Sequence, residues 1–262
     1  MIKSGRSRKL SVEEEMLIMA VIIMTGTSQG IGAAMAHVLL ERGHRLVGIS
    51  RRRNDALIQA FPTELVCMEA DLADTAGLGP LMERIFQQMG TDEERVCLVN
   101  NAAVLAPLRN AEQCDSAEIA RHMQINLIAP MILTSLFAKH TSGLRGEKRV
   151  LNISSGSARY LLPGMSCYCT AKAGLDTFTA CVGLEQQNKE YPLQIASVWP
   201  GMNETQMQEE ARRQDGGFQN AEMFIEAKKN GRLHSPDETA RKLADLLLGE
   251  SFPHGTIVES LY

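Results

Sequence analysis

Short apolar runs recur along the chain, separated by longer segments in which apolar residues return at every third or fourth position. A run of about four to eight apolar residues is typical of a buried strand, whereas the wider spacing is typical of a helix that packs by one face. The runs that predict strands are Val21–Thr25, Arg45–Ser50, Leu65–Ala70, Val96–Asn100, Arg149–Ser154, Gln194–Val198 and Gly255–Glu259.

The segments between these runs predict helices. The clearest are Ile31–Arg42, Ser116–His140, Ser166–Glu190 and a segment from Ser235 to Leu248. Pro130 predicts a kink in the second of them, because proline cannot donate a backbone hydrogen bond. Strands that alternate with helices form right-handed βαβ units. We therefore expect an α/β fold: a doubly wound, mostly parallel sheet with helices on both faces.

No linker, internal repeat or low-complexity block divides the sequence, so residues 19–262 are expected to form one domain. Residues 1–18 are interpreted as a disordered extension. Their basic residues and the apolar run from Met16 to Met24 imitate a secretion signal, but three glutamates interrupt the basic part. The run is also shorter than the roughly 20 residues that span a membrane. The polar, irregular stretch Met202–Leu233, within residues 202–235, is a candidate lid over a binding site.

Composition narrows the class of protein. The net charge of -4 gives no general attraction to nucleic acid or to an acidic membrane. The six cysteines form no CxxC pair and no metal-ligand spacing, and they are interpreted as buried thiols of a reducing compartment. We therefore expect a cytoplasmic protein with no metal, nucleic-acid partner or membrane span.

The first predicted strand runs into TGTSQGIG at residues 25–32 and then into a helix. Gly26 permits a tight turn, Gly30 permits close approach of a ligand, and Gly32 permits close packing of helix and strand. The start of the helix offers free N–H groups to a pyrophosphate. This GxxxGxG pattern in a strand–turn–helix context indicates a dinucleotide cofactor, with an ordinary glycine turn as the alternative.

Basic residues follow the second predicted strand, which ends in SRRR at residues 50–53. An NAD enzyme carries an acid at this place for the ribose 2′-hydroxyl, whereas a guanidinium pairs with a 2′-phosphate. NADP(H) is therefore favoured, and a solvated basic loop is the alternative. Asp71 and Leu72 follow the third strand and are placed to meet the adenine. The NNAA at residues 100–103 follows the fourth and borders the nicotinamide ribose.

A tyrosine and a lysine stand four residues apart in the segment YCTAK, at Tyr168 and Lys172. On a helix these side chains are neighbours on one face. An ammonium favours the phenolate, so the pair is a candidate acid/base catalyst in which Lys172 lowers the pKa of Tyr168.

These motifs together resemble the classical short-chain dehydrogenases/reductases, over residues 21–262. The matching elements, in the family's order, are TGTSQGIG, Asp71, NNAA, Asn126, NISSG, YCTAK and Pro200-Gly201. Ala103 departs from the glycine usual in the family, and its methyl group is tolerated only at negative φ. Several stretches are similar to the bacterial sepiapterin reductase-like branch, which includes the benzil reductases that form (S)-benzoin.

The resemblance implies a single Rossmann-like domain with a seven-stranded sheet in the order 3-2-1-4-5-6-7. It also implies a catalytic set of Asn126, Ser155, Tyr168 and Lys172, with Ser155 and Tyr168 touching the substrate. Ser155 is chosen over Ser154 because it lies 13 positions before Tyr168, as in the family pattern. The residues implied for cofactor binding are Met24, Gly26, Ser28, Gln29, Gly30, Ile31, Gly32, Ser50, Arg51, Arg52, Asp71, Leu72, Asn100, Asn101, Ala102, Tyr168, Lys172, Pro200, Gly201, Met202 and Thr205.

The roles implied for the catalytic set are chemically coherent. Ser155 bonds the substrate carbonyl oxygen, Tyr168 donates a proton to the developing alkoxide, Lys172 tunes the phenol and holds the nicotinamide ribose, and Asn126 organises a water.

The sequence thus predicts an NADPH-dependent carbonyl reductase. Its small-molecule substrate is expected to be a bulky or aromatic α-diketone or a sepiapterin-like ketone, because the lid and its surroundings are rich in apolar, adaptable side chains. These side chains are Met165, Trp199, Met202, Met207, Phe218, Met223 and Phe224, and packing between helices is their alternative role. Reduction of 3-oxoacyl thioesters or another alcohol/ketone pair, and a non-catalytic NADP-sensing protein, remain open. The resemblance implies a homodimer, with a homotetramer as the alternative.

Overall fold

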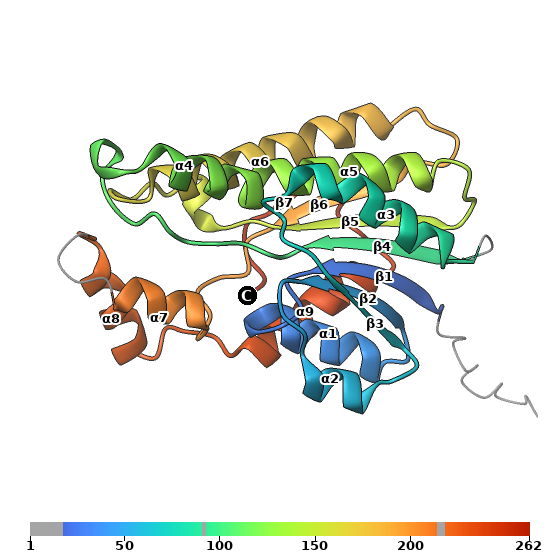
Figure 1. Ribbon diagram of the computed structural model, residues 1–262, viewed down its shortest axis with the longest axis horizontal. Coiled ribbons are helices and arrows are strands. Elements are labelled where there is room, and N and C mark those ends of the chain that lie inside the picture. Colours follow the sequence, from blue (N-terminus) through green and yellow to red (C-terminus); the bar gives the residue numbers. More distant parts are fainter. Residues whose placement is uncertain (1–17, 91–92, 214–217) are drawn as a thin grey trace, which may run out of the picture.

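The computed structural model describes residues 18–90, 93–213 and 218–262. Within these ranges, seven parallel strands form one sheet in the order β3-β2-β1-β4-β5-β6-β7, as predicted (Figure 1). The strands are β1 (Ala20–Thr25), β2 (Arg45–Ser50), β3 (Leu65–Glu69), β4 (Arg95–Asn100), β5 (Glu147–Ile153), β6 (Leu193–Val198) and β7 (Ile257–Val258).

Helices cover both faces of the sheet, and the two layers are seen edge-on in Figure 1. The α-helices are α1 (Gly30–Glu41), α2 (Asp55–Ala60), α3 (Leu78–Gln87), α4 (Ser116–Met123), α5 (Ala129–His140), α6 (Ser166–Gln186), α7 (Gln206–Arg212), α8 (Ala221–Lys229) and α9 (Pro236–Leu248). One core joins α1 and α9 to the sheet through side chains such as Met35 and Leu243, and the other joins α3, α5 and α6 through Met82, Phe137 and Val182. The sheet is therefore buried on both faces, which explains its nearly continuous apolar strands.

The long helix predicted over residues 116–140 is interrupted, but not by a simple kink at the proline. A π-helical turn, Gln124–Ile128, joins α4 to α5, and the N–H of Ala129 bonds the carbonyl of Gln124 five residues back. Pro130 accounts for this turn, because it has no N–H for the carbonyl of Asn126 and its ring would clash with that carbonyl.

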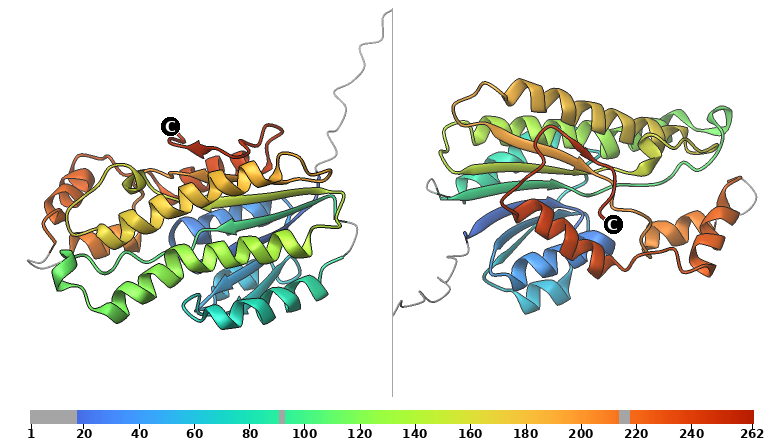
Figure 2. Two further views of the ribbon diagram at one scale, coloured as in Figure 1. Left: turned by 90° about the horizontal axis from the view of Figure 1, so that it is seen from above. Right: turned by 180° about the vertical axis from the view of Figure 1, so that it is seen from behind.

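The segment expected to be an irregular lid contains the helices α7 and α8, so the prediction of irregular chain was wrong there. These helices lie apart from the two layers, beyond the carboxyl ends of the strands (Figures 1 and 2). Polar residues dominate the segment because only a few positions, such as Ala211, Phe218 and Phe224, are buried.

Two smaller expectations also have an outcome. All six cysteines are free, but only Cys97, Cys167 and Cys169 are buried, and Cys181 is exposed. The expected disordered extension falls almost entirely on residues 1–17, outside the described ranges. In the part of the chain that the structure describes, no helix is long and apolar enough to cross a membrane.

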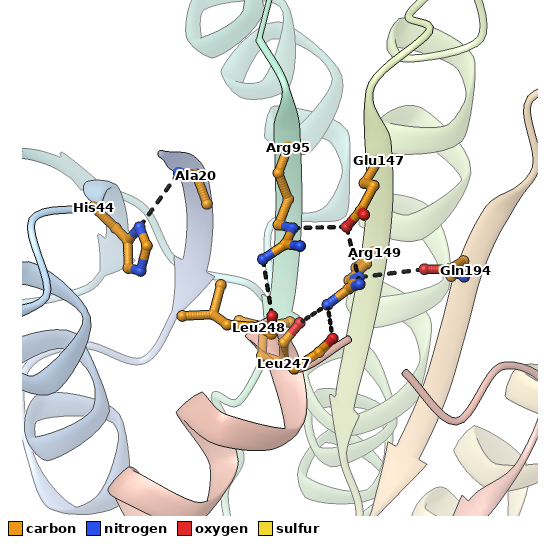
Figure 3. Close-up of polar contacts among 9 residues, drawn as sticks. Ala20, His44, Arg95, Glu147, Arg149, Gln194, Leu247 and Leu248 are labelled. Atoms are coloured by element: carbon orange, nitrogen blue, oxygen red, sulfur yellow. Dashed lines mark hydrogen bonds and ion pairs between the residues drawn. The ribbon is translucent and has the colours of Figure 1, made fainter. Parts of the chain in front are cut away.

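Two buried arginines, at the amino ends of the strands, bind the end of α9 to the sheet (Figure 3). Arg149, 2% exposed, donates to the carbonyls of Leu247 and Gly249 at 2.7 and 2.8 Å. Arg95 donates to the carbonyl of Leu248 at 2.9 Å, and both guanidinium groups pair with Glu147. The last carbonyls of a helix carry partial negative charge and lack partners within the helix, so the arginines satisfy them.

We expect Arg149→Met to destabilise the protein by about 3 kcal/mol or more, because the buried carbonyl of Leu247 and the half-buried carbonyl of Gly249 lose their donors. Urea unfolding measures the change. Arg42→Met is the control: Arg42 forms an exposed ion pair with Asp245, and its loss should cost about 1 kcal/mol or less. Equal losses in the two variants would contradict a structural role for Arg149.

Candidate active site

A cleft of about 700 Å³ opens at the carboxyl ends of the strands. Its walls come from the glycine turn after β1, the end of β2, the loops after β3 to β6, the α7–α8 segment and residues 259–262. The order of the strands reverses between β1 and β4, and ligands of doubly wound sheets bind at this position.

The glycine turn has a geometry that other residues cannot adopt. Gly26 and Gly30 have φ of +77° and +58°. A Cβ atom on Gly32 would lie 2.0 Å from the carbonyl oxygen of Gly26, so the first turn of α1 touches the end of β1. Among the described residues, no side chain caps α1 and no acid lies in its first turn. Its N–H groups are therefore available to an anionic group such as a pyrophosphate.

A hydrogen-bond junction between Thr25 and Asn101 fixes this turn against the end of β4. The Thr25 hydroxyl accepts from the N–H groups of Asn101 and Ala102 at 3.0 and 3.1 Å. The Asn101 amide donates to the carbonyls of Thr25 and Gly26 at 3.0 and 3.2 Å. Asn101 lines the cleft, but its amide hydrogens hold the turn and are not free for a ligand. Ala103 also lines the cleft at a negative φ, since only glycines have positive φ in the described ranges.

Charged groups gather at the end of the cleft next to β2 and β3. Arg51 and Arg52 are exposed and line it. Asp71 accepts from Arg121 at 2.9 Å and from the N–H of Ala73 at 3.0 Å. Burial acts to raise the pKa of Asp71, yet these two donors and the charge of Arg51 hold it below its usual range. The arginines at this end of the cleft can bind a phosphate group, and Asp71 lies where the polar edge of an adenine ring would meet it.

Ser155, Tyr168 and Lys172 line the middle of the same cleft. Ser155 follows β5, and its hydroxyl accepts from the N–H of Ser157 at 3.1 Å. Ser154 is buried and donates to the carbonyl of Lys172 at 3.3 Å, so it holds α6 against β5. Both serines line the cleft, and the choice of Ser155 as the catalytic one stays a prediction.

The ionisation of the pair differs from the sequence-based expectation. Burial raises the pKa of Tyr168 to about 12, and a hydrogen bond with Ser155 acts in the opposite direction. Burial also lowers the pKa of Lys172 to about 8, against the charge of Asp176. The Lys172 ammonium lies 5.6 Å from the centre of the tyrosine ring and donates to the carbonyl of Ile153 at 2.7 Å. In this geometry burial outweighs the effects that lower the pKa of the phenol, so the pKa of Tyr168 lies above its ordinary value and that of Lys172 lies below its own.

Asn126 lies in the π-helical turn and is 1% exposed. Its amide accepts from the N–H of Val104 at 2.9 Å and donates to the Val104 carbonyl at 2.7 Å. It also meets the ring of His122 at 2.8 Å, and that ring bonds the carbonyl of Ala106 at 2.7 Å. The side chain of Asn126 holds the loop after β4 beside Tyr168, whose ring lies edge-on to His122. The i, i+4 spacing to Asn126 was the only signal for His122 in the sequence.

The other predicted residues divide into two groups. Met24 lies in the core, and Asn100 bonds Asn152 and Thr134 at 2.8 and 3.2 Å, so these two lie beneath the cleft in the described structure. The predicted residues that line the cleft are Gly26, Ser28, Gln29, Gly30, Ile31, Gly32, Ser50, Arg51, Arg52, Asp71, Leu72, Asn101, Ala102, Pro200, Gly201, Met202 and Thr205.

The remaining end of the cleft is largely apolar. Its walls include Leu105, Leu162, Met165, Tyr160, Trp199, Met207, Met223 and Phe224. Phe218 is not among the lining residues and packs against Phe224 behind the cleft wall, in the buried cluster that also holds Leu105 and Met165, so the helix-packing role applies to this residue. No group of three or more His, Cys, Asp or Glu side chains within the described ranges is arranged to hold a metal ion.

Comparisons with known proteins report on the family and on the fold. The family model described as short chain dehydrogenase matches residues 20–216. A Bacillus cereus protein named benzil reductase ((S)-benzoin forming) is 39% identical over 247 residues, which cover 92% of this chain and 98% of the relative. The Bos taurus sepiapterin reductase is 28% identical over 251 residues, which cover 90% and 92%. The crystal structure of the KRED1-Pglu enzyme has a TM-score of 0.80 at 24% identity and covers 91% of this chain and 100% of its own; it shows the fold.

We expect Gly32→Ala to lower the thermal stability and to weaken dinucleotide binding by about tenfold or more, because the methyl group forces the first turn of α1 away from Gly26. Differential scanning fluorimetry and a fluorescence titration measure the two effects. Gly79→Ala is the matched control: its Cβ would meet nothing within 4 Å, so a helical alanine should be neutral or stabilising. Normal binding by Gly32→Ala would argue against the assigned role of this turn.

Proposed function

Because the chain belongs to the short-chain dehydrogenase family, whose members use NAD(P), we propose that it is an NADPH-dependent carbonyl reductase. One observation carries the proposal: Ser155, Tyr168 and Lys172 line the same cleft as a glycine turn suited to a pyrophosphate. The bound dinucleotide would supply a hydride to a ketone carbon, and the chain supplies the proton and the orientation.

Ser155 and Tyr168 act on the carbonyl oxygen of the substrate. Their hydroxyl groups hold this oxygen between them, where negative charge develops as the carbonyl is reduced. With its pKa raised to about 12, the phenol of Tyr168 is protonated at neutral pH. It is therefore a proton donor to an alkoxide, which is a stronger base than the phenolate.

Lys172 supplies a positive charge next to the phenol ring of Tyr168. Its pKa near 8 means that the ammonium form dominates at neutral pH and is lost as the pH rises through about 8. The ammonium compensates the negative charge that Tyr168 acquires when it donates its proton. We also propose that Lys172 binds the hydroxyl groups of the nicotinamide ribose of the cofactor.

The preference for NADPH rests on Arg51 and Arg52. Both are exposed cations on the cleft wall at the end of β2, where a 2′-phosphate would lie. Asp71 is the acid at this end, and it is already paired with Arg121. Two guanidinium groups make more favourable contacts with a 2′-phosphate than with the 2′-hydroxyl of an unmodified ribose.

The substrate that fits best is an aromatic or bulky α-diketone. Support comes from the apolar end of the cleft, where Leu105, Met165 and Trp199 surround the space next to Ser155 and Tyr168. The name of the 39% identical relative, a benzil reductase that forms (S)-benzoin, points the same way. A homodimer, a cytoplasmic location and the role of residues 202–235 as a lid complete the proposal.

We expect Tyr168→Phe to abolish NADPH-dependent reduction of benzil and related diketones, with at least about a hundredfold loss of kcat, because no proton donor remains. NADPH affinity should stay within about threefold of wild type, since the phenyl ring still fills its site. Absorbance at the NADPH band follows turnover, and fluorescence titration follows binding. Retained turnover would refute the assignment. Binding without turnover of any carbonyl by the wild-type protein would favour a sensing function.

We expect Arg51→Asp to raise the Kd of NADPH by about tenfold or more and to leave the Kd of NADH unchanged or lower, because a charge-assisted contact to the 2′-phosphate is lost. Arg53→Asp is the control, since Arg53 lies beside Asp55 and outside the described cleft wall. Equal effects of the two substitutions would show that the basic residues act only through general charge.

A further inference from the structure

A buried carboxylate, Asp176, lies one helical turn beyond Lys172 on α6. It is 8% exposed, and both of its oxygens accept hydrogen bonds from β6 and the loop that follows it. Ser197 donates to one oxygen at 2.5 Å, and the indole N–H of Trp199 donates to the other at 2.9 Å. A buried carboxylate is costly unless it is paired or hydrogen-bonded, and these two donors offset that cost while they tie Asp176 to β6 and to Trp199.

The bond to Trp199 fixes part of the cleft wall. Trp199 is 6% exposed, lines the cleft beside Ser155 and meets the ring of Tyr160 edge-on, with 6.1 Å between ring centres. Tyr160 is 66% exposed, so it can move, whereas its partner is held by a charged acceptor. An indole fixed on the cleft wall can offer its ring to an aryl group of a substrate bound in the cleft.

The same carboxylate acts on Lys172. Residues four apart on a helix lie next to one another, and Asp176 favours the charged form of this lysine against burial. The other groups that face Lys172 are the phenol of Tyr168 on α6, the imidazole of His122 on α4 and the carbonyl of Ile153 on β5. Burial holds the pKa of His122 below its usual range, so this ring is neutral at pH 7. Asp176 is therefore the negative charge that acts on the ammonium.

We propose that Asp176 is a positioning residue with two linked effects: it fixes Trp199 as the stacking wall for an aromatic ketone, and it keeps Lys172 in its ammonium form. This inference rests on the proposed carbonyl reduction for its consequence in catalysis, but both effects exist in the protein without substrate. One buried charge thus joins substrate selection to the proton-transfer residues.

The test uses the fact that Trp199 is the only tryptophan, so the emission of the protein reports on it alone. Three variants are compared with wild type. Asp176→Asn removes the charge but keeps the shape, and Asp176→Glu keeps the charge but shifts the acceptor. Asp245→Asn makes the same chemical change in the exposed ion pair with Arg42.

In the protein without substrate, acrylamide quenching of the emission should be weak in wild type and at least about twofold stronger in Asp176→Glu, because the acceptor of the indole N–H is displaced; the amide oxygen of Asp176→Asn can still accept this bond. In protein labelled with ¹⁵N-lysine, the Nζ resonance of Lys172 should titrate near pH 8. The midpoint of this titration should lie about one pH unit or more lower in Asp176→Asn, because removal of a nearby negative charge disfavours the ammonium. Asp176→Glu and Asp245→Asn should leave this titration near its wild-type position.

Turnover gives the matching result in catalysis. In the pH profile of kcat, the fall in activity at high pH should move to lower pH in Asp176→Asn and stay in place in the other two variants. The KM for an aryl diketone should rise about tenfold or more in Asp176→Glu, while the KM for a small aliphatic diketone stays within about threefold.

Unchanged quenching in Asp176→Glu, or an unchanged Lys172 titration in a folded Asp176→Asn protein, would overturn the inference. Should that variant fail to fold, Asp176→Glu carries the test, and quenching equal to wild type would overturn the inference. Failure of the wild-type protein to reduce any carbonyl refutes the proposed function alone, because quenching and titration need no turnover.

Discussion

The contact between the end of β1 and the end of β4 is the constraint on which the site depends. The Thr25 hydroxyl and the Asn101 amide join these strands with five hydrogen bonds, at the point where the strand order reverses. The junction leaves no space for a side chain at Gly32, where a Cβ would meet both Gly26 and Asn101. The glycine turn, the start of α1 and the loop that carries Ala102 and Ala103 all take their positions from it.

The sequence predicts most of the fold because its two patterns are strong: continuous apolar runs for the strands, and apolar residues at every third or fourth position for the helices. Residues of the central strands, such as Ile22, Leu98 and Val150, are completely buried, so their runs are apolar throughout. The helix expected from Ser235 to Leu248 is found as α9, in which Ser235 accepts from the N–H of Glu238 and Pro236 is the first residue. The π-helical turn and the helices α7 and α8 were missed. The first arises from a steric conflict four residues before Pro130, and the others bury too few side chains to give a clear pattern.

The candidate site is predictable to the level of residues that line a cleft, and less so to the level of their chemistry. Spacing correctly brings Tyr168 and Lys172 together, but it carries no information on burial, which decides the pKa of both groups. Motif position placed Asn100 and Asn101 at the cofactor, whereas the bonds of their amides hold the strand ends together. His122, Asp176 and Trp199 belong to no motif, because their importance comes from contacts between different elements.

The π-helical turn has a consequence for how this chain can change in length. The turn adds one residue to an otherwise regular helix, and each residue of a helix rotates the chain by about 100°. Deletion of a single residue within Gln124–Ile128 would close the wide turn, bring the ring of Pro130 against a carbonyl, and move the side chains of the turn around the helix by up to that amount. Asn126 would then face away from Val104, and His122 would leave the ring of Tyr168. The segment therefore tolerates substitution better than deletion, and its length, more than its composition, is the property that ties this helix to the active site.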